Sequence, residues 1–102
     1  MPVLHSLKIW PRYFEAVKKG LKTFEVRVED DKKFAFGDYV TLKEYDPDRT
    51  YDVYSRSFTG PMKGYTGEEI SFKIGYVLPI EVTKEGHSKV VFSLLPIRDQ
   101  DA

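Results

Sequence analysis

Three charged residues stand close together near the start of the chain, in the segment GLKTFEVR of residues 20–27. Lys22 and Arg27 are cations suited to phosphate oxygens, and Glu25 can accept hydrogen bonds from a base edge or hold Arg27 in place. One carboxylate between two cations predicts a selective polar pocket for an anionic ligand. The alternative interpretation is structural. Glu25 and Arg27 would then form a solvated ion pair, which contributes at most about 1 kcal/mol.

The elements around this segment must bring the three side chains together. Trp10, Phe14 and Val17 recur at helical spacing, and Pro11 suits the first position of a helix. We expect this helix to end at Gly20, which readily adopts a left-handed conformation, with Trp10 and Phe14 in the core. Residues 23–29 then alternate as a strand, which we expect to carry Glu25 and Arg27 on its outward face.

Other residues could contribute to the same pocket. Lys8 is predicted to point outward from a strand at residues 5–9, and Thr23 offers a hydroxyl beside Glu25. Tyr13 and Tyr65 are candidates for stacking on an unpaired base. His5 can donate a hydrogen bond or transfer a proton near neutral pH, although a lone histidine more often has a structural role.

The rest of the chain reads as a small strand-rich domain. Strand-like segments are predicted at residues 39–45, 71–80 and 89–97, with a hairpin turn at residues 86–88. Pro79 and Pro96 are expected at edges or bulges. Residues 46–69 show no sustained periodicity and are predicted to form a long loop. About five strands and one or two short helices predict a single α+β or small-barrel domain over residues 1–102.

Composition narrows the function further. The chain has 102 residues, 16 basic and 16 acidic side chains and no cysteine, so thiolate metal sites and disulfides are excluded. Residues 1–27 carry six basic and two acidic side chains, which places the phosphate-friendly part at the N-terminal end. No signal peptide, bilayer-spanning segment or nucleotide-triphosphate motif is recognisable, and we predict a cytoplasmic protein without metal or cofactor.

The four residues Gly20, Lys22, Glu25 and Arg27 match the G-x-K-x-x-E-x-R signature of the ASCH domain, which belongs to the PUA-like superfamily. The segments HSLKIWPRYFEAVKKG and FGDYVTLKEYD, followed by YTGEE and a strand-rich tail, resemble a prokaryotic and phage branch of unassigned function. The resemblance implies a PUA-like β-barrel of about five strands, whose cleft contains the signature residues. It also implies RNA or nucleotide binding.

Two other functions remain open at this point. One ASCH branch that the chain resembles hydrolyses acylated nucleosides with a lysine and a threonine three positions later; the chain has Glu25 at that place. An enzyme of this kind would use Lys22 and Glu25 as an acid/base pair. The third interpretation is a protein-interaction module that uses the 46–69 segment or exposed strand edges.

Overall fold

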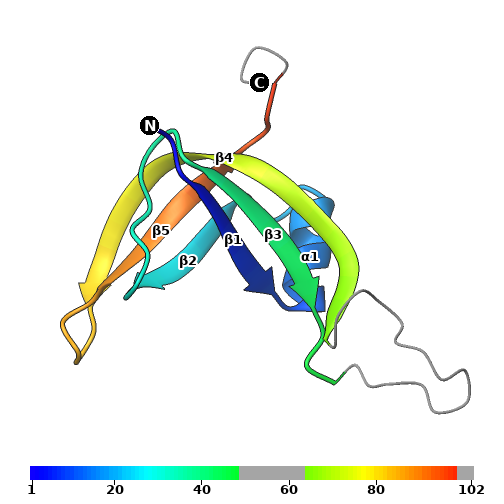
Figure 1. The fold of residues 1–102 in the computed structure, drawn as a ribbon, viewed down its shortest axis with the longest axis horizontal. Helices are drawn as coiled ribbons and strands as arrows, with labels where there is room; N and C mark the ends of the chain where they lie inside the picture. The colour runs from blue at the N-terminus through cyan, green and yellow to red at the C-terminus, as the bar shows by residue number, and fades with distance from the viewer. Residues whose placement is uncertain (49–63, 99–102) are drawn as a thin grey trace, which may run out of the picture. The chain divides into compact units, whose positions relative to one another are not determined.

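A computed structural model describes residues 1–48 and 64–98 of the protein (Figure 1). These residues form one helix and five strands, which confirms the predicted small α+β fold. The elements in chain order are β1 (Leu4–Ile9), α1 (Pro11–Lys18), β2 (Phe24–Glu29), β3 (Tyr39–Tyr45), β4 (Tyr65–Val82) and β5 (Ser88–Leu95).

The five strands belong to one mixed sheet with the order β1-β3-β4-β5-β2, so β1 and β2 are its end strands. Figure 1 shows β1 and β3 side by side and running in the same direction. β5 pairs antiparallel with both β2 and β4. The β4–β5 register shifts between Pro79 and Glu81, which confirms the irregularity predicted at Pro79.

The chain divides into two compact units. The first unit contains Met1–His5, Thr23–Val40 and Ser71–Ala102, and the second contains Ser6–Lys22 and Thr41–Ile70. The single domain that the sequence predicts over residues 1–102 stays a prediction. Buried apolar side chains of the first unit come from β3, β4, β5 and the segment before β3; they are Phe34, Val40, Ile74, Val90, Phe92 and Leu94.

The second unit buries one face of β1 and one face of α1. Leu7 and Ile9 of β1 are buried and Lys8 between them is exposed, as the alternating pattern predicts. Phe14 and Val17 of α1 are also buried. Gly20 ends the helical segment with a φ of 77°, and its N–H donates to the carbonyl oxygen of Val17 at 3.0 Å.

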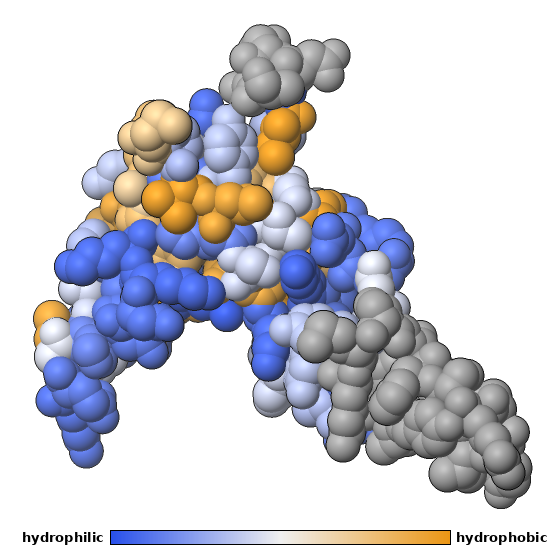
Figure 2. Space-filling view, viewed as in Figure 1, coloured by the Kyte–Doolittle hydropathy of each residue, from blue (hydrophilic) through white to orange (hydrophobic). Residues whose placement is uncertain are grey.

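Two loop predictions have different outcomes. The hairpin predicted at residues 86–88 is present, with Gly86 at a φ of 86°, but the connection spans residues 83–87 and Ser88 already belongs to β5. Figure 2 shows that this hairpin tip is hydrophilic. The loop predicted at residues 46–69 is wrong at its end, since β4 begins at Tyr65. Residues 49–63 of that loop lie outside the described residues.

Candidate functional site

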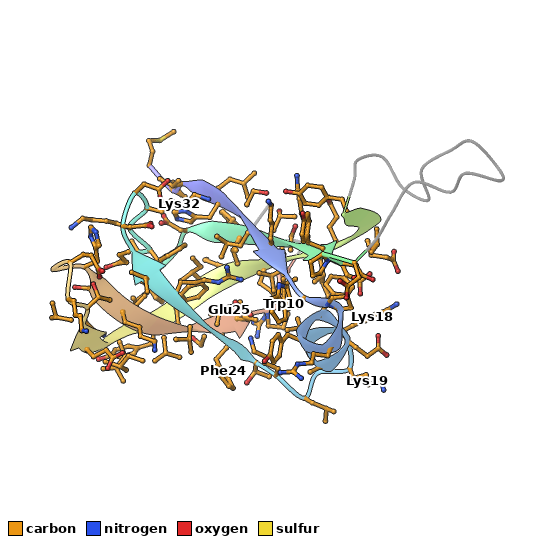
Figure 3. The ribbon with its side chains drawn as sticks, turned by 90° about the horizontal axis from the view of Figure 1, so that it is seen from below. Trp10, Lys18, Lys19, Phe24, Glu25 and Lys32 are labelled. Carbon is orange, nitrogen blue, oxygen red and sulfur yellow. The ribbon has the colours of Figure 1, made fainter. Side chains whose placement is uncertain are left out.

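The charged residues of β2 face the core of the first unit, which corrects the outward orientation expected from the sequence. Glu25 is only 3% exposed, whereas Phe24, Val26 and Val28 are 44%, 39% and 40% exposed. Figure 3 shows Phe24 and Glu25 leaving the strand on opposite sides. An alternating pattern divides the residues of a strand between two faces. It does not determine which of the two faces is buried, and in the end strand β2 the buried face is the charged one.

Pairing with β5 explains this orientation. Glu25 lies opposite Phe92 and Arg27 lies opposite Val90 in the antiparallel register. Directly opposed residues share one face of a sheet, and Phe92 and Val90 are each 1% exposed. The two charged residues therefore lie beside buried apolar side chains.

Glu25 and Arg27 form a close ion pair on this face. Nε of Arg27 donates a hydrogen bond to Oε2 of Glu25 at 3.0 Å, and Nη2 of Arg27 lies 2.9 Å from the same oxygen in an ion pair. The Glu25 side chain is 4% exposed and the Arg27 side chain is 27% exposed. The pair is thus not the solvated surface pair of the structural interpretation. The buried carboxylate fixes a guanidinium that still reaches solvent.

Two aromatic rings connect this pair to a second buried polar pair in the same unit. The ring of Phe92 lies 4.9 Å from that of Phe34, and Phe34 lies 4.7 Å from the imidazole of His5. Nε2 of His5 is 2.9 Å from Oδ2 of Asp38. His5 is 6% exposed, so its position agrees with the structural role that the sequence analysis favoured for a lone histidine.

Asp38 is a buried polar residue, 6% exposed, that the sequence did not indicate as a site residue. Its carboxylate accepts the backbone N–H groups of Val3 at 3.0 Å and Ala35 at 3.2 Å, in addition to its contact with His5. Burial raises the pKa of Asp38, but the hydrogen bonds from His5 and from the two backbone groups outweigh burial and lower this pKa below 3.8. The sequence did not single out this residue, because two of its three partners, Val3 and His5, are 35 and 33 positions away.

Lys8 and Tyr65, both predicted ligand residues, lie together in the second unit. The ammonium group of Lys8 is 4.6 Å from the ring centre of Tyr45 and 5.7 Å from that of Tyr65. The two tyrosine rings meet edge to face at 5.1 Å. A cation over tyrosine faces is favourable, so these contacts hold both rings on the strands. Tyr65 therefore makes these contacts from the first residue of β4, and not from the loop in which the sequence placed it.

A second aromatic and basic surface surrounds α1. The guanidinium of Arg12 lies 4.8 Å from the ring centre of Tyr13 and donates to its hydroxyl at 2.7 Å. Trp10 is 55% exposed, so the prediction that it packs in the core is wrong. Figure 3 shows Lys18 and Lys19 projecting from the same helix. Cations and exposed rings therefore share this segment.

The remaining predicted residues have main-chain roles at the end of α1 and the start of β2. The N–H of Lys22 donates to the carbonyl oxygen of Ala16 at 3.1 Å, and its side chain is half-buried. The carbonyl oxygen of Thr23 accepts the N–H of Leu94 at 2.9 Å. The structure thus brings Glu25 to Arg27 in one unit and Lys8 to Tyr65 in the other. The cleft predicted to unite Lys22 with Glu25 and Arg27 stays a prediction.

The described residues contain neither a metal-binding cluster nor a helix that could span a membrane. Residues 1–48 and 64–98 contain no group of three or more histidine, aspartate or glutamate side chains arranged to hold a metal ion. In the same part of the chain, α1 is the only helix, and it is too short to cross a membrane.

Comparison with known proteins places the chain in a family. No curated protein matches it. Residues 4–93 match the family model described as a domain of unknown function, DUF3850. The match includes β1 to β4, α1 and most of β5. Because this match covers most of the sequence, the chain belongs to the DUF3850 family.

Proposed function

We propose that this protein binds RNA or a nucleotide and that Arg27, oriented by Glu25, is the residue that recognises the ligand. The observation that carries the proposal is the pairing of a nearly buried carboxylate with a guanidinium that is 27% exposed. A guanidinium held in one orientation loses little freedom when it binds a planar anionic group. Phosphate oxygens and the acceptor atoms of a base are the groups that it recognises best.

The energetic argument supports a ligand role for this pair. Transfer of a carboxylate and a guanidinium from water to an apolar face is unfavourable, and apolar residues in their place would often be neutral or stabilising. Phe24, Val26 and Val28 of the same strand are apolar and more exposed. Such a conflict between pattern and burial is expected where a residue serves function rather than stability.

The surface of α1 supports RNA as the ligand class. Trp10 and Tyr13 are 55% and 40% exposed, and Arg12, Lys18 and Lys19 lie on the same segment. Rings stack on unpaired bases while neighbouring cations contact phosphates, which is the usual composition of a single-strand binding surface.

The resemblance of Gly20, Lys22, Glu25 and Arg27 to the ASCH signature supports the same function. In this proposal the fold is PUA-like, and Lys22 and Thr23 join the ligand contacts. The protein acts in the cytoplasm.

A titration with a short single-stranded RNA tests the proposal. We expect saturable binding at low salt that weakens as salt rises, because phosphate contacts release counterions. Arg27→Gln should weaken binding about tenfold or more. Lys32→Gln removes the same charge from an exposed residue of the first unit and should have little effect. Binding that is insensitive to salt, or equal in the two variants, would count against the proposal.

Hydrolysis of an acylated nucleoside is a second candidate, favoured by one observation. Glu25 is a nearly buried carboxylate, and desolvated carboxyl groups are common general acids and bases. With Lys22 it would form the acid/base pair of such an enzyme. Incubation with N-acylated cytidine tests the idea: release of cytidine that Glu25→Gln abolishes supports it, and no release under conditions where a known amidohydrolase works dismisses it.

A further inference from the structure

The strand β2 ends the sheet and presents an apolar row at its edge. In the sheet order β1-β3-β4-β5-β2, its hydrogen-bonded neighbour among the described strands is β5. Phe24, Val26 and Val28 are about two-fifths exposed on one face, at 44%, 39% and 40%. Edge strands of soluble proteins are usually protected by charged side chains, prolines or bulges. The segment Phe24–Glu29 contains no lysine or proline and its register with β5 is continuous, but its charged residues Glu25, Arg27 and Glu29 alternate with the apolar row.

The backbone of the apolar row points away from β5. Leu94 donates its N–H to the carbonyl oxygen of Thr23, which identifies Thr23 and Leu94 as a hydrogen-bonded pair of the antiparallel ladder. Along such a ladder, the backbone N–H and C=O groups of one residue point toward the neighbouring strand, and those of the next residue point away from it. Val26 and Val28 therefore direct their N–H and C=O groups to the open edge of the sheet.

The sequence of β2 is complementary to itself in an antiparallel arrangement centred on Val26. In that register Val26 meets its own counterpart, and Phe24 meets the partner's Val28. On the opposite face, Glu25 meets the partner's Arg27, and Arg27 meets the partner's Glu25. Apolar pairs and opposite charges are the favourable cross-strand neighbours of an antiparallel sheet. No other register of this strand against itself places both Glu25–Arg27 pairs directly opposite.

We propose that two copies of this chain pair along β2 about a two-fold axis at Val26, forming one continuous sheet through both copies. The occupant is a second copy because each position from Phe24 to Val28 finds a matching position on the other strand, which is the property of an isologous interface. Each Glu25 then lies between its own Arg27, at 2.9 Å within the chain, and the partner's Arg27 across the axis. The partner thereby contributes a residue to the buried charged pair of each copy.

A single introduced cysteine tests the register directly. The chain has no cysteine, so Val26→Cys carries the only thiol. Hydrogen-bonded antiparallel partners have Cα atoms about 5.5 Å apart, a separation that a disulfide spans. We expect Val26→Cys to form a covalent dimer under mild oxidation. Leu78→Cys is the matched control, since Leu78 is 45% exposed and pairs with Val91 inside the sheet. Crosslinking of Val26→Cys no faster than that of Leu78→Cys would overturn the proposal.

Sedimentation equilibrium without any ligand gives an independent test, so the result does not depend on RNA binding. We expect a reversible dimer of the wild-type chain. Val26→Lys places two ammonium groups opposite each other at the axis and should raise the dissociation constant about tenfold or more. Leu78→Lys should leave this constant unchanged, and circular dichroism should show both variants folded. A wild-type chain that stays monomeric up to millimolar concentration, or equal dissociation of both variants, would contradict the proposed interface.

Discussion

At the level of single residues, the ion pair of Glu25 and Arg27 affects the stability of the fold and is also the site of the proposed function. Two of the three guanidinium nitrogens of Arg27 lie within 3.0 Å of one carboxylate oxygen, and Glu25 is nearly buried opposite Phe92. Loss of one partner from a buried pair is costly because the other charge is left without compensation. Loss of both partners is less costly. The pair is therefore expected to show strong energetic coupling.

Stability measurements on this pair test the coupling. We expect Arg27→Leu to lower the free energy of unfolding by about 2–3 kcal/mol, because Glu25 stays buried without its partner. The double variant Glu25→Leu/Arg27→Leu should lose clearly less than the sum of the two single variants. Urea denaturation of the four proteins measures both quantities. Additive losses would show that the two side chains do not interact as described.

Asp38 gives a prediction about pH. Its pKa is lower in the folded chain than the ordinary 3.8, so the folded state favours the ionised form. The resulting stabilisation is complete above pH 3.8 and is lost as the pH falls through the folded-state pKa. We expect Asp38→Asn to be less stable than the wild-type chain at pH 6, and the difference to shrink at pH 3. Urea denaturation at the two pH values measures it, and a constant difference would contradict the assignment.

At the scale of elements, α1 illustrates what a sequence pattern can and cannot predict. Pro11 and Gly20 predicted the helix, and Phe14 and Val17 predicted its buried face. Trp10 shares their spacing but precedes the helix, and it has an extended backbone with a ψ of 151°. An extended residue does not continue the helical stripe, so its side chain lies outside the buried face. Periodicity holds only within the element that generates it.

A matched pair of alanine variants tests the two faces of this segment. Phe14 is 3% exposed, so Phe14→Ala should lower the free energy of unfolding by about 3–4 kcal/mol through loss of packing and a residual cavity. Trp10 is 55% exposed, and Trp10→Ala should cost less than about 1 kcal/mol. Thermal or urea denaturation compares them. Similar losses in the two variants would place Trp10 in the core after all.

The strands show the same limit on prediction. The segment of residues 39–45 was predicted with its observed bounds and the hairpin at Gly86 was predicted at its observed place, because turn residues and alternation are local signals. The start of β4 at Tyr65 was missed, since residues 46–69 show no sustained periodicity, although Tyr65 packs against Tyr45. The buried face of β2 was assigned wrongly for a different reason. Pairing with β5, far along the chain, decides which face is covered.

At the level of the whole molecule, the sequence indicated one of the two buried polar pairs and missed the other. The sequence indicated Glu25 and Arg27 as a pair because they share one face of a predicted strand, and the two side chains do form an ion pair. It did not indicate Asp38, because its partners Val3 and His5 lie at the N-terminal end of the chain, far away in sequence. In the proposed function, the excess of basic residues in residues 1–27 is the feature of the whole chain that favours an anionic ligand.

The central claim is that Glu25 holds the Arg27 guanidinium ready for an anionic ligand. The most direct measurement is the ¹H–¹⁵N NMR signal of the Arg27 Nε–H group, assigned by its absence in Arg27→Lys, during a titration with a short single-stranded RNA. We expect a signal protected from exchange in the free protein by the 3.0 Å hydrogen bond to Glu25, which shifts in a saturable manner as RNA is added. A signal that stays in place while RNA binds would contradict the account.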